Sequence, residues 1–149
     1  MLDRGLIGRR SEPVWNEVEN GAIRRFAAAL GIGDPVHHDE NHAKAAGHRG
    51  LLAPATFPIT LRGSLDLERA LGLEDRGLVH ADQSLELFRP ICAGDRIEVI
   101  EVIADVAERP GTGGPVDVVV VEDEGRDDQG HLVYRARRTL IVRPPLREA

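Results

Sequence analysis

The sequence predicts an α+β protein in which a long antiparallel sheet wraps around a central helix. Two apolar patterns of helical period occupy the first half of the 149-residue chain, whereas from Leu78 onward apolar residues recur at every second position. Turns rich in Gly and Pro separate these later segments, which favours consecutive antiparallel strands. Because one face of such a sheet must be covered, we expect the second helix to lie against it.

The bulk composition predicts one globular domain over residues 1–149. With 42% apolar and 30% charged residues, the chain can bury a core of ordinary size. No apolar run approaches the roughly 20 residues that span a bilayer, and MLDRGLIGRR lacks the apolar segment of a secretory signal. The single cysteine, Cys92, cannot form an intrachain disulfide, which predicts a cytoplasmic protein. A net charge of −6 and few aromatic residues argue against nucleic acid as a partner.

The first half predicts a short strand over residues 14–18 and then a helix. The helix is indicated by apolar residues at i, i+3, i+4 and i+7, namely Ile23, Phe26, Ala27 and Leu30. Asn20 is placed to cap its N-terminus, and Gly31 is the residue expected just beyond its end.

A second, largely buried helix is predicted in LLAPATFPITLRGSLDLERALGL. Thr56 is placed to cap it, and Pro58 falls in the first turn, where a missing N–H costs little. Gly63 is unfavourable inside a helix, so we interpret it as a position of close packing against the sheet.

The second half predicts strands in QSLELFRPI, RIEVIEVIADVAE, VDVVVVED and HLVYRARRTLIVRP, joined by turns at AGDR, ERPGTGGP and EGRDDQG. In the last strand one face carries Leu132, Tyr134, Ala136, Leu140 and Val142, and the other carries Val133, Arg135, Arg137, Thr139 and Arg143. The three arginines would suit a coenzyme A pyrophosphate, although such a face is more often solvated or paired with acids.

The loop GIGDPVHHDENHAKAAG, from Gly31 to Gly47, gathers the polar chemistry of the chain. Asp39 is placed to cap a short helix at ENHAKAA, and Asp34 before Pro35 is most simply a turn residue. Histidines at 38, 42 and 48 raise the question of zinc, but no cysteine lies nearby. We therefore expect no metal.

Three segments carry a family resemblance: FAAALGIGDPVHHDENHAKAAG, LLAPATFP and LFRPICAGDRI. They resemble the MaoC-like, or hydratase 2, branch of the hotdog superfamily and, more narrowly, its N-terminal FAS1-like dehydratase subgroup. The resemblance runs from about Gly5 to Val142. It implies a hotdog dimer that acts on acyl thioesters of coenzyme A or acyl carrier protein, without a metal or redox cofactor.

The implied reaction adds water to a trans-2-enoyl thioester or removes it from an (R)-3-hydroxyacyl thioester. It needs an acid/base pair and N–H donors for the thioester oxygen. In the family motif S-G-D-x-N-P-[LIV]-H, His37 falls on the histidine, Asp34 on the asparagine and Ile32 on the aspartate. A gap would instead align the motif's G-D with Gly33 and Asp34, but the spacing from Phe26 to His37 matches the family without a gap, so the motif's carboxylate is missing from its place. The candidate catalytic residues are His37 and, as a carboxylate acting from a shifted position, Asp34.

Candidate substrate-binding residues are Ile32, Asp39, Ala55 and Thr56, the last two at the start of the second predicted helix. Catalytic members tend to carry A-H-G where this chain has Ala53, Pro54 and Ala55, although an alanine still offers an N–H. The A-P-x-T-F form is usual in the FAS1-like subgroup, whose domain often serves as a non-catalytic half.

Two hypotheses follow. The chain is either a hydratase or dehydratase that uses His37, or a non-catalytic acyl-binding subunit that pairs with a catalytic hotdog chain. Either one predicts a homodimer or a heterodimer, because a single sheet leaves an edge strand that partners usually pair.

Overall fold

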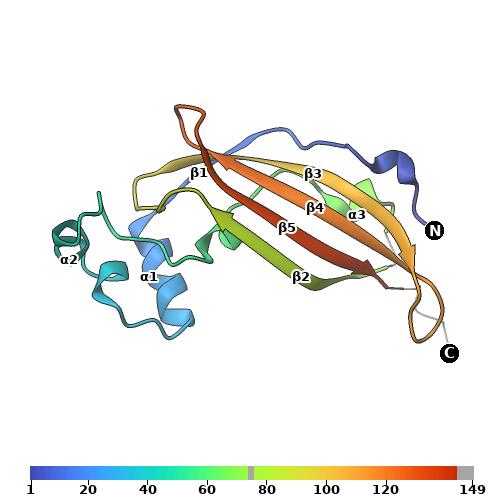
Figure 1. Cartoon of the computed structure of the whole chain (residues 1–149), viewed down its shortest axis with the longest axis horizontal. Coiled ribbons are helices and arrows are strands. Elements are labelled where there is room, and N and C mark those ends of the chain that lie inside the picture. The colour runs from blue at the N-terminus through green and yellow to red at the C-terminus, as the bar shows by residue number, and fades with distance from the viewer. Residues whose placement is uncertain (74–75, 144–149) are drawn as a thin grey trace.

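A computed structural model describes residues 1–73 and 76–143 as a five-stranded antiparallel sheet accompanied by short helices (Figure 1). The strand order is β1-β3-β4-β5-β2, so β2 and β1 form the two edges. The strands are β1 (Val14–Glu17), β2 (Leu78–Leu87), β3 (Arg96–Arg109), β4 (Val116–Arg126) and β5 (Leu132–Val142). The predicted fold class, with its opening strand and long antiparallel sheet, is confirmed.

The helical elements are short and lie in the first half of the chain. They are η1 (Arg4–Leu6), α1 (Asn20–Ala29), η2 (Pro35–His37), α2 (Glu40–Ala45), η3 (Phe57–Thr60) and α3 (Leu67–Ala70). In Figure 1, α1 and α2 lie together beyond one end of the sheet, and the segment between them carries the polar loop.

The predicted first helix is confirmed as α1, with two corrections. Ile23 and Ala27 are fully buried and Phe26 packs edge-on against Phe57, but Leu30 is 53% exposed because α1 ends before it. The N-cap is Glu19 rather than Asn20, and it makes no side-chain capping bond. Gly31 takes a positive φ of 70°, as expected for the residue beyond the helix end.

The predicted central helix is wrong as a continuous element. The chain forms only η3 and α3, and Leu61 between them is already extended. The side chain of Asn16 accepts the amide N–H of Arg62 at 2.9 Å, and Glu101 accepts that of Leu65 at 2.8 Å. Because the sheet supplies these acceptors, the backbone between η3 and α3 needs no helical hydrogen bonds.

Two details of that segment agree with the sequence. Pro58 lies in the first turn of η3, where its missing N–H is tolerated. Gly63 packs so closely on Glu101 that a Cβ atom would overlap the Glu101 carboxylate, so its interpretation as a close-packing position is confirmed. Thr56 occupies the N-cap position of η3 as predicted, but its side chain makes no capping bond.

One face of the sheet, called the inner face below, carries two apolar clusters. The first cluster joins the ends of β3 and β5 to α1 and η3, and it includes Ile23, Phe57, Val99 and Tyr134. The second cluster lies toward the other end of the strands, under η1 and α3, and includes Ile103, Val121, Leu140 and Val142. The alternation predicted for β5 therefore holds, except that Val133, expected on the other face, is also fully buried.

Candidate active site

A cavity of about 510 Å³ opens beside the polar loop, and we call it the His37 pocket. It is bounded by three segments: the loop after α1, the strand-like stretch before η3, and the end of β2 with the residues that follow it. Its lining is Ile32, His37, Leu52, Ala53, Pro54, Ala55, Leu87, Phe88, Arg89, Pro90 and Ile91. Most of these side chains are apolar, so the pocket is suited to a hydrocarbon chain.

His37 is placed by a short ladder of local contacts. Asp34 accepts the amide N–H of Val36 at 3.1 Å, which begins η2 and turns the chain. The amide of Leu52 then donates to the carbonyl of Val36 at 3.0 Å, so the two segments lie side by side. His37 itself is 9% exposed, and its Nδ1 lies 2.6 Å from the carbonyl oxygen of Leu52.

That last contact orients the imidazole ring. A carbonyl oxygen only accepts, so Nδ1 must carry the proton and donate it. In the neutral ring Nε2 is then the basic nitrogen, and it remains for a ligand in the pocket.

The acidic residues of the loop are used in other ways. Asp34 is exposed and caps η2, while Asp39 caps α2 by accepting the amides of Asn41 and His42 at 2.9 and 3.2 Å. These two interpretations, a turn residue and a helix cap, are confirmed. Neither aspartate belongs to the lining of the His37 pocket, and the Asp34 carboxylate is engaged with the Val36 amide rather than with the His37 ring. The catalytic role of Asp34 stays a prediction.

Only some of the predicted substrate-binding residues lie in the pocket. Ile32 and Ala55 line the pocket with His37, whereas Asp39 and Thr56 do not belong to its lining. His38, which neighbours His37, turns away and binds the carbonyl oxygen of Ile32 through Nε2 at 2.8 Å. Over residues 1–73 and 76–143 no group of three or more His, Cys, Asp and Glu side chains is arranged to hold a metal ion.

The far wall of the pocket, Leu87–Ile91, was not predicted as part of the site. Its only signal in the sequence was LFRPI, which entered as part of the family resemblance. Leu87 and Phe88 are 37% and 45% exposed, so this wall ends in an apolar rim beside the β2 edge.

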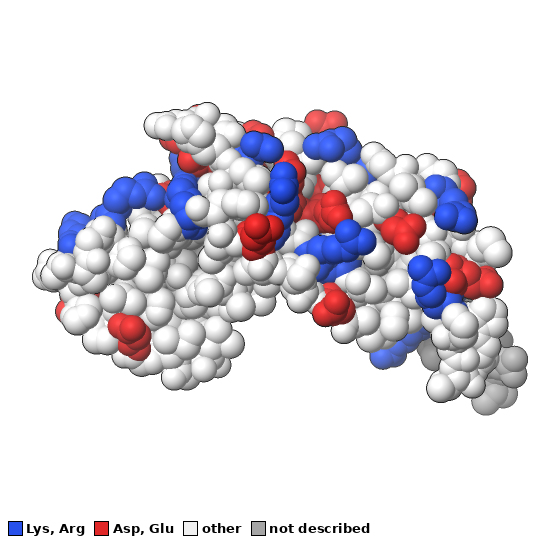
Figure 2. Space-filling model, viewed as in Figure 1, with Lys and Arg blue, Asp and Glu red and all other residues white. Residues whose placement is uncertain are grey.

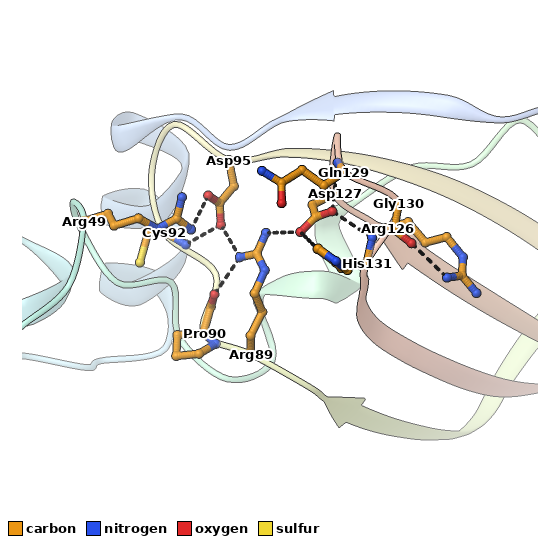
Figure 3. Close-up of polar contacts among 10 residues, drawn as sticks. All are labelled: Arg49, Arg89, Pro90, Cys92, Asp95, Arg126, Asp127, Gln129, Gly130 and His131. Carbon is orange, nitrogen blue, oxygen red and sulfur yellow. Dashed lines mark hydrogen bonds and ion pairs between the residues drawn. The ribbon is translucent and has the colours of Figure 1, made fainter.

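An ion-pair network fixes this wall from behind (Figure 3). The carboxylate of Asp95, 5% exposed, accepts from Arg49 at 2.6 Å, from Arg89 at 2.8 Å and from the Cys92 amide at 3.0 Å. Arg89 also approaches Asp127 in the β4–β5 hairpin at 3.5 Å. Burial disfavours the charge of Arg89, but these two carboxylates outweigh that effect and raise its pKa.

Two of the three arginines predicted on the outer face of β5 are paired with acids. Arg135 pairs with Glu124 at 3.4 Å and Arg137 pairs with Glu122 at 2.6 Å, while Arg143 lies one residue beyond β5. Basic and acidic side chains are interspersed over the strands in Figure 2. The acid-paired interpretation of Arg135 and Arg137 is therefore confirmed.

The fold and the pocket together define a class: hotdog-fold proteins of the MaoC-like dehydratase type. Residues 5–136 match the family model described as "FAS1-like, dehydratase domain region". The chain belongs to this family.

Similar proteins agree with this assignment. A UPF0336 protein of Streptomyces griseus is 36% identical over 147 residues, which cover 95% of each chain, and a UPF0336 protein of Thermobifida fusca is 33% identical. Among solved structures, a chain of the truncated HadBC complex, a 3R-hydroxyacyl-ACP dehydratase from Mycobacterium tuberculosis, superposes with a TM-score of 0.74 and 30% identity. The superposition covers 91% of this chain and 96% of that one.

A chain of the ChsH1-ChsH2 complex from Mycobacterium tuberculosis gives a TM-score of 0.73 at 18% identity, with 93% of this chain and 91% of that chain covered. This likeness concerns the fold alone. None of the helices in the described part of the chain has the length and apolar character needed to cross a membrane.

Proposed function

We propose that this chain is the acyl-binding subunit of a two-chain dehydratase that acts on (R)-3-hydroxyacyl thioesters or, in reverse, hydrates trans-2-enoyl thioesters. The single observation that carries the proposal is the lining of the His37 pocket. Ile32 falls on the aspartate of the family motif in the ungapped alignment, and no Asp or Glu within residues 1–73 and 76–143 belongs to the lining. The pocket can hold an acyl chain but lacks the carboxylate of the acid/base pair.

The reaction explains why that absence matters. Dehydration removes a proton from C2 of the thioester and expels the C3 hydroxyl as water after protonating it, so one base and one acid must act together. His37 is one such group, and Ile32 cannot be the other. We therefore assign the complete Asp-His pair to a second hotdog chain, with coenzyme A and acyl carrier protein both open as thioester carriers.

The edges of the sheet support pairing with another chain. β2 is a ten-residue edge strand that pairs only with β5 among the described strands, and its end carries the exposed Leu87 and Phe88. A long edge with an apolar end is a favourable site for another strand. The HadBC structure is a complex, which agrees with a paired arrangement.

A second function, catalysis by this chain without another hotdog subunit, is favoured by the orientation of His37. Its Nδ1 is held by Leu52, and its Nε2 is free to act as a base toward a ligand beside Ile32 and Ala55. The amide N–H of Ala55, at the rim of the pocket, would then face the thioester oxygen.

Hydration of crotonyl-coenzyme A separates the two functions. The purified chain is assayed alone and then mixed with a co-encoded hotdog partner, each time with His37→Ala as the matched variant. We expect activity only in the mixture, and we expect it to survive His37→Ala. Activity of the chain alone that disappears in His37→Ala would overturn the acyl-binding assignment and establish the catalytic one.

A further inference from the structure

A group of charged side chains is buried on the inner face, between its two apolar clusters. It comprises Glu101 on β3, Asp123 on β4 and Arg138 on β5, and we call it the inner charge cluster. Glu101 is 6% exposed and forms a short ion pair with Arg138, whose guanidinium also lies 3.8 Å from Asp123. The cluster therefore crosses the three central strands of the sheet.

The register of the strands shows how sharply the cluster divides the face. Glu101 pairs with Asp123, which pairs with Ala136. In the next row on one side, Gly125 pairs with Tyr134, and Tyr134 belongs to the first apolar cluster. In the next row on the other side, Arg138 pairs with Val121, and Val121 belongs to the second apolar cluster. The charged row therefore lies about 7 Å, or two residues along a strand, from the nearest row of each apolar cluster.

The segment between η3 and α3, where a continuous central helix was predicted, covers the Glu101 side of the cluster. Gly63 rests on the Glu101 carboxylate, and the amide of Leu65 donates to it at 2.8 Å. Three buried polar atoms in this region, Asp123 Oδ1, Arg138 Nε and the Tyr134 hydroxyl, have no hydrogen-bond partner among the described residues. The cluster is consequently a polar patch between the two apolar clusters.

The strand register places one wall of the His37 pocket close to this cluster. Leu87, in the pocket lining, pairs in register with Tyr134, and Leu85, two residues earlier on the same face of β2, pairs with Ala136. Leu85 and Leu61 are partly buried hydrophobic residues packed against the first apolar cluster. An acyl chain that passes Leu87 would follow Leu85 and then meet Asp123 and Arg138.

We propose that a bound acyl chain extends from the His37 pocket along Leu85 and ends at the inner charge cluster, so that this chain accommodates short and medium acyl groups and excludes the distal part of long ones. The inference rests on the proposed acyl-binding function. Each methylene that enters apolar surroundings tightens binding up to about fourfold. A methylene pressed against the cluster gains nothing comparable, because it would have to disrupt ion pairs that it cannot replace.

The test is a chain-length series measured by isothermal titration calorimetry with butanoyl-, octanoyl-, dodecanoyl- and hexadecanoyl-coenzyme A. For the wild type, we expect affinity to rise with length and to stop rising before hexadecanoyl. In the triple variant Glu101→Gln/Asp123→Val/Arg138→Met the cluster has no charge, and the glutamine keeps an acceptor for the Leu65 amide. We expect its affinity to keep rising, with a gain of at least about tenfold for hexadecanoyl relative to octanoyl.

The matched control is Glu122→Gln/Arg137→Met, which removes an ion pair of the same kind from the exposed outer face of β4 and β5. Its length profile should equal that of the wild type. A second variant, Leu85→Trp, leaves the buried charges in place and narrows the route before the cluster, so its affinity should stop rising at a shorter length. If the triple variant does not fold, the length profile of Leu85→Trp tests whether the acyl chain passes Leu85.

Two results would overturn the inference alone: a wild-type affinity that rises through hexadecanoyl, or the same length profile in the wild type and in the folded variants. The absence of binding at every length would instead contradict the acyl-binding function, and the inference would fall with it.

Discussion

His37 Nδ1 lies 2.6 Å from the carbonyl oxygen of Leu52, in the same pocket as Ile32. The ring is therefore held with Nε2 as its basic nitrogen, and the residue that we align with the aspartate of the family motif is apolar. This combination makes the missing carboxylate a testable feature of the site.

Replacing Ile32 with Asp should create hydratase activity in the chain alone. The new carboxylate would stand where the family motif has its aspartate, and an acid/base group contributes about 10²–10⁴-fold to such a step. The measurement is the rate of crotonyl-coenzyme A hydration. Ile32→Asn is the matched control, since its side chain has similar size but cannot transfer a proton, and it should remain inactive. Equal rates for the two variants would contradict the prediction.

Gly63→Ala should destabilise the fold by about 2 kcal/mol, because the added methyl group overlaps the Glu101 carboxylate and forces the segment off the sheet. Urea unfolding measures this free energy. Gly33→Ala is the matched control, since nothing lies within 4 Å of the position its Cβ would take and its φ is not positive. Its stability should be unchanged or slightly higher. A Gly63→Ala variant as stable as Gly33→Ala would show that the segment does not rest on Glu101.

Asp123→Asn should stabilise the chain near neutral pH. The pKa of Asp123 is raised to about 6, mainly by burial. The nearby charge of Arg138 lowers this pKa and that of Glu101 raises it. The Tyr134 hydroxyl also faces this region. The folded chain thus holds this proton more tightly than the unfolded one. The corresponding stability is present below about pH 4, and is lost as the pH rises through about 6.

An asparagine cannot ionise, so the variant should gain on the order of 2 kcal/mol over the wild type at pH 7.5, and the difference should shrink toward pH 4. Urea unfolding between these pH values gives the comparison. Asp128→Asn, in the exposed turn between β4 and β5, provides the control and should show no such trend. If the stability gain of Asp123→Asn over the wild type instead grew as the pH fell, a raised pKa of Asp123 in the folded chain would be contradicted.

Asp95→Ala should destabilise the chain by roughly 3 kcal/mol, because it leaves Arg89, Arg49 and the Cys92 amide without their shared acceptor. Glu122→Ala removes an exposed partner of Arg137 and should cost less than about 1 kcal/mol. Thermal unfolding of both variants tests the contrast. Comparable losses would mean that the network behind the pocket wall contributes no more than a surface ion pair.

Much of this fold was predictable because its signals are local. The period of two from Leu78 onward, the turns between strands and the apolar stripe of α1 each depend on neighbours in the chain. The same holds for Asp34 and Asp39, whose capping bonds reach only two or three residues. The family motif likewise predicted His37 as a site residue and Ile32 in place of an aspartate, and both stay predictions.

The remaining features depended on contacts between distant residues. The local pattern of residues 61–66 predicts a helix, but Asn16 and Glu101 accept backbone N–H groups of this segment and stabilise its extended conformation. These two acceptors are distant in the sequence, so no local pattern could predict the contacts. The pocket wall at Leu87–Ile91 and the inner charge cluster also form only when separate strands pair. Local periodicity thus determined the strands and α1, and the family motif indicated His37, whereas tertiary structure decided what surrounds that histidine, because burial and strand register bring together residues that are dozens of positions apart.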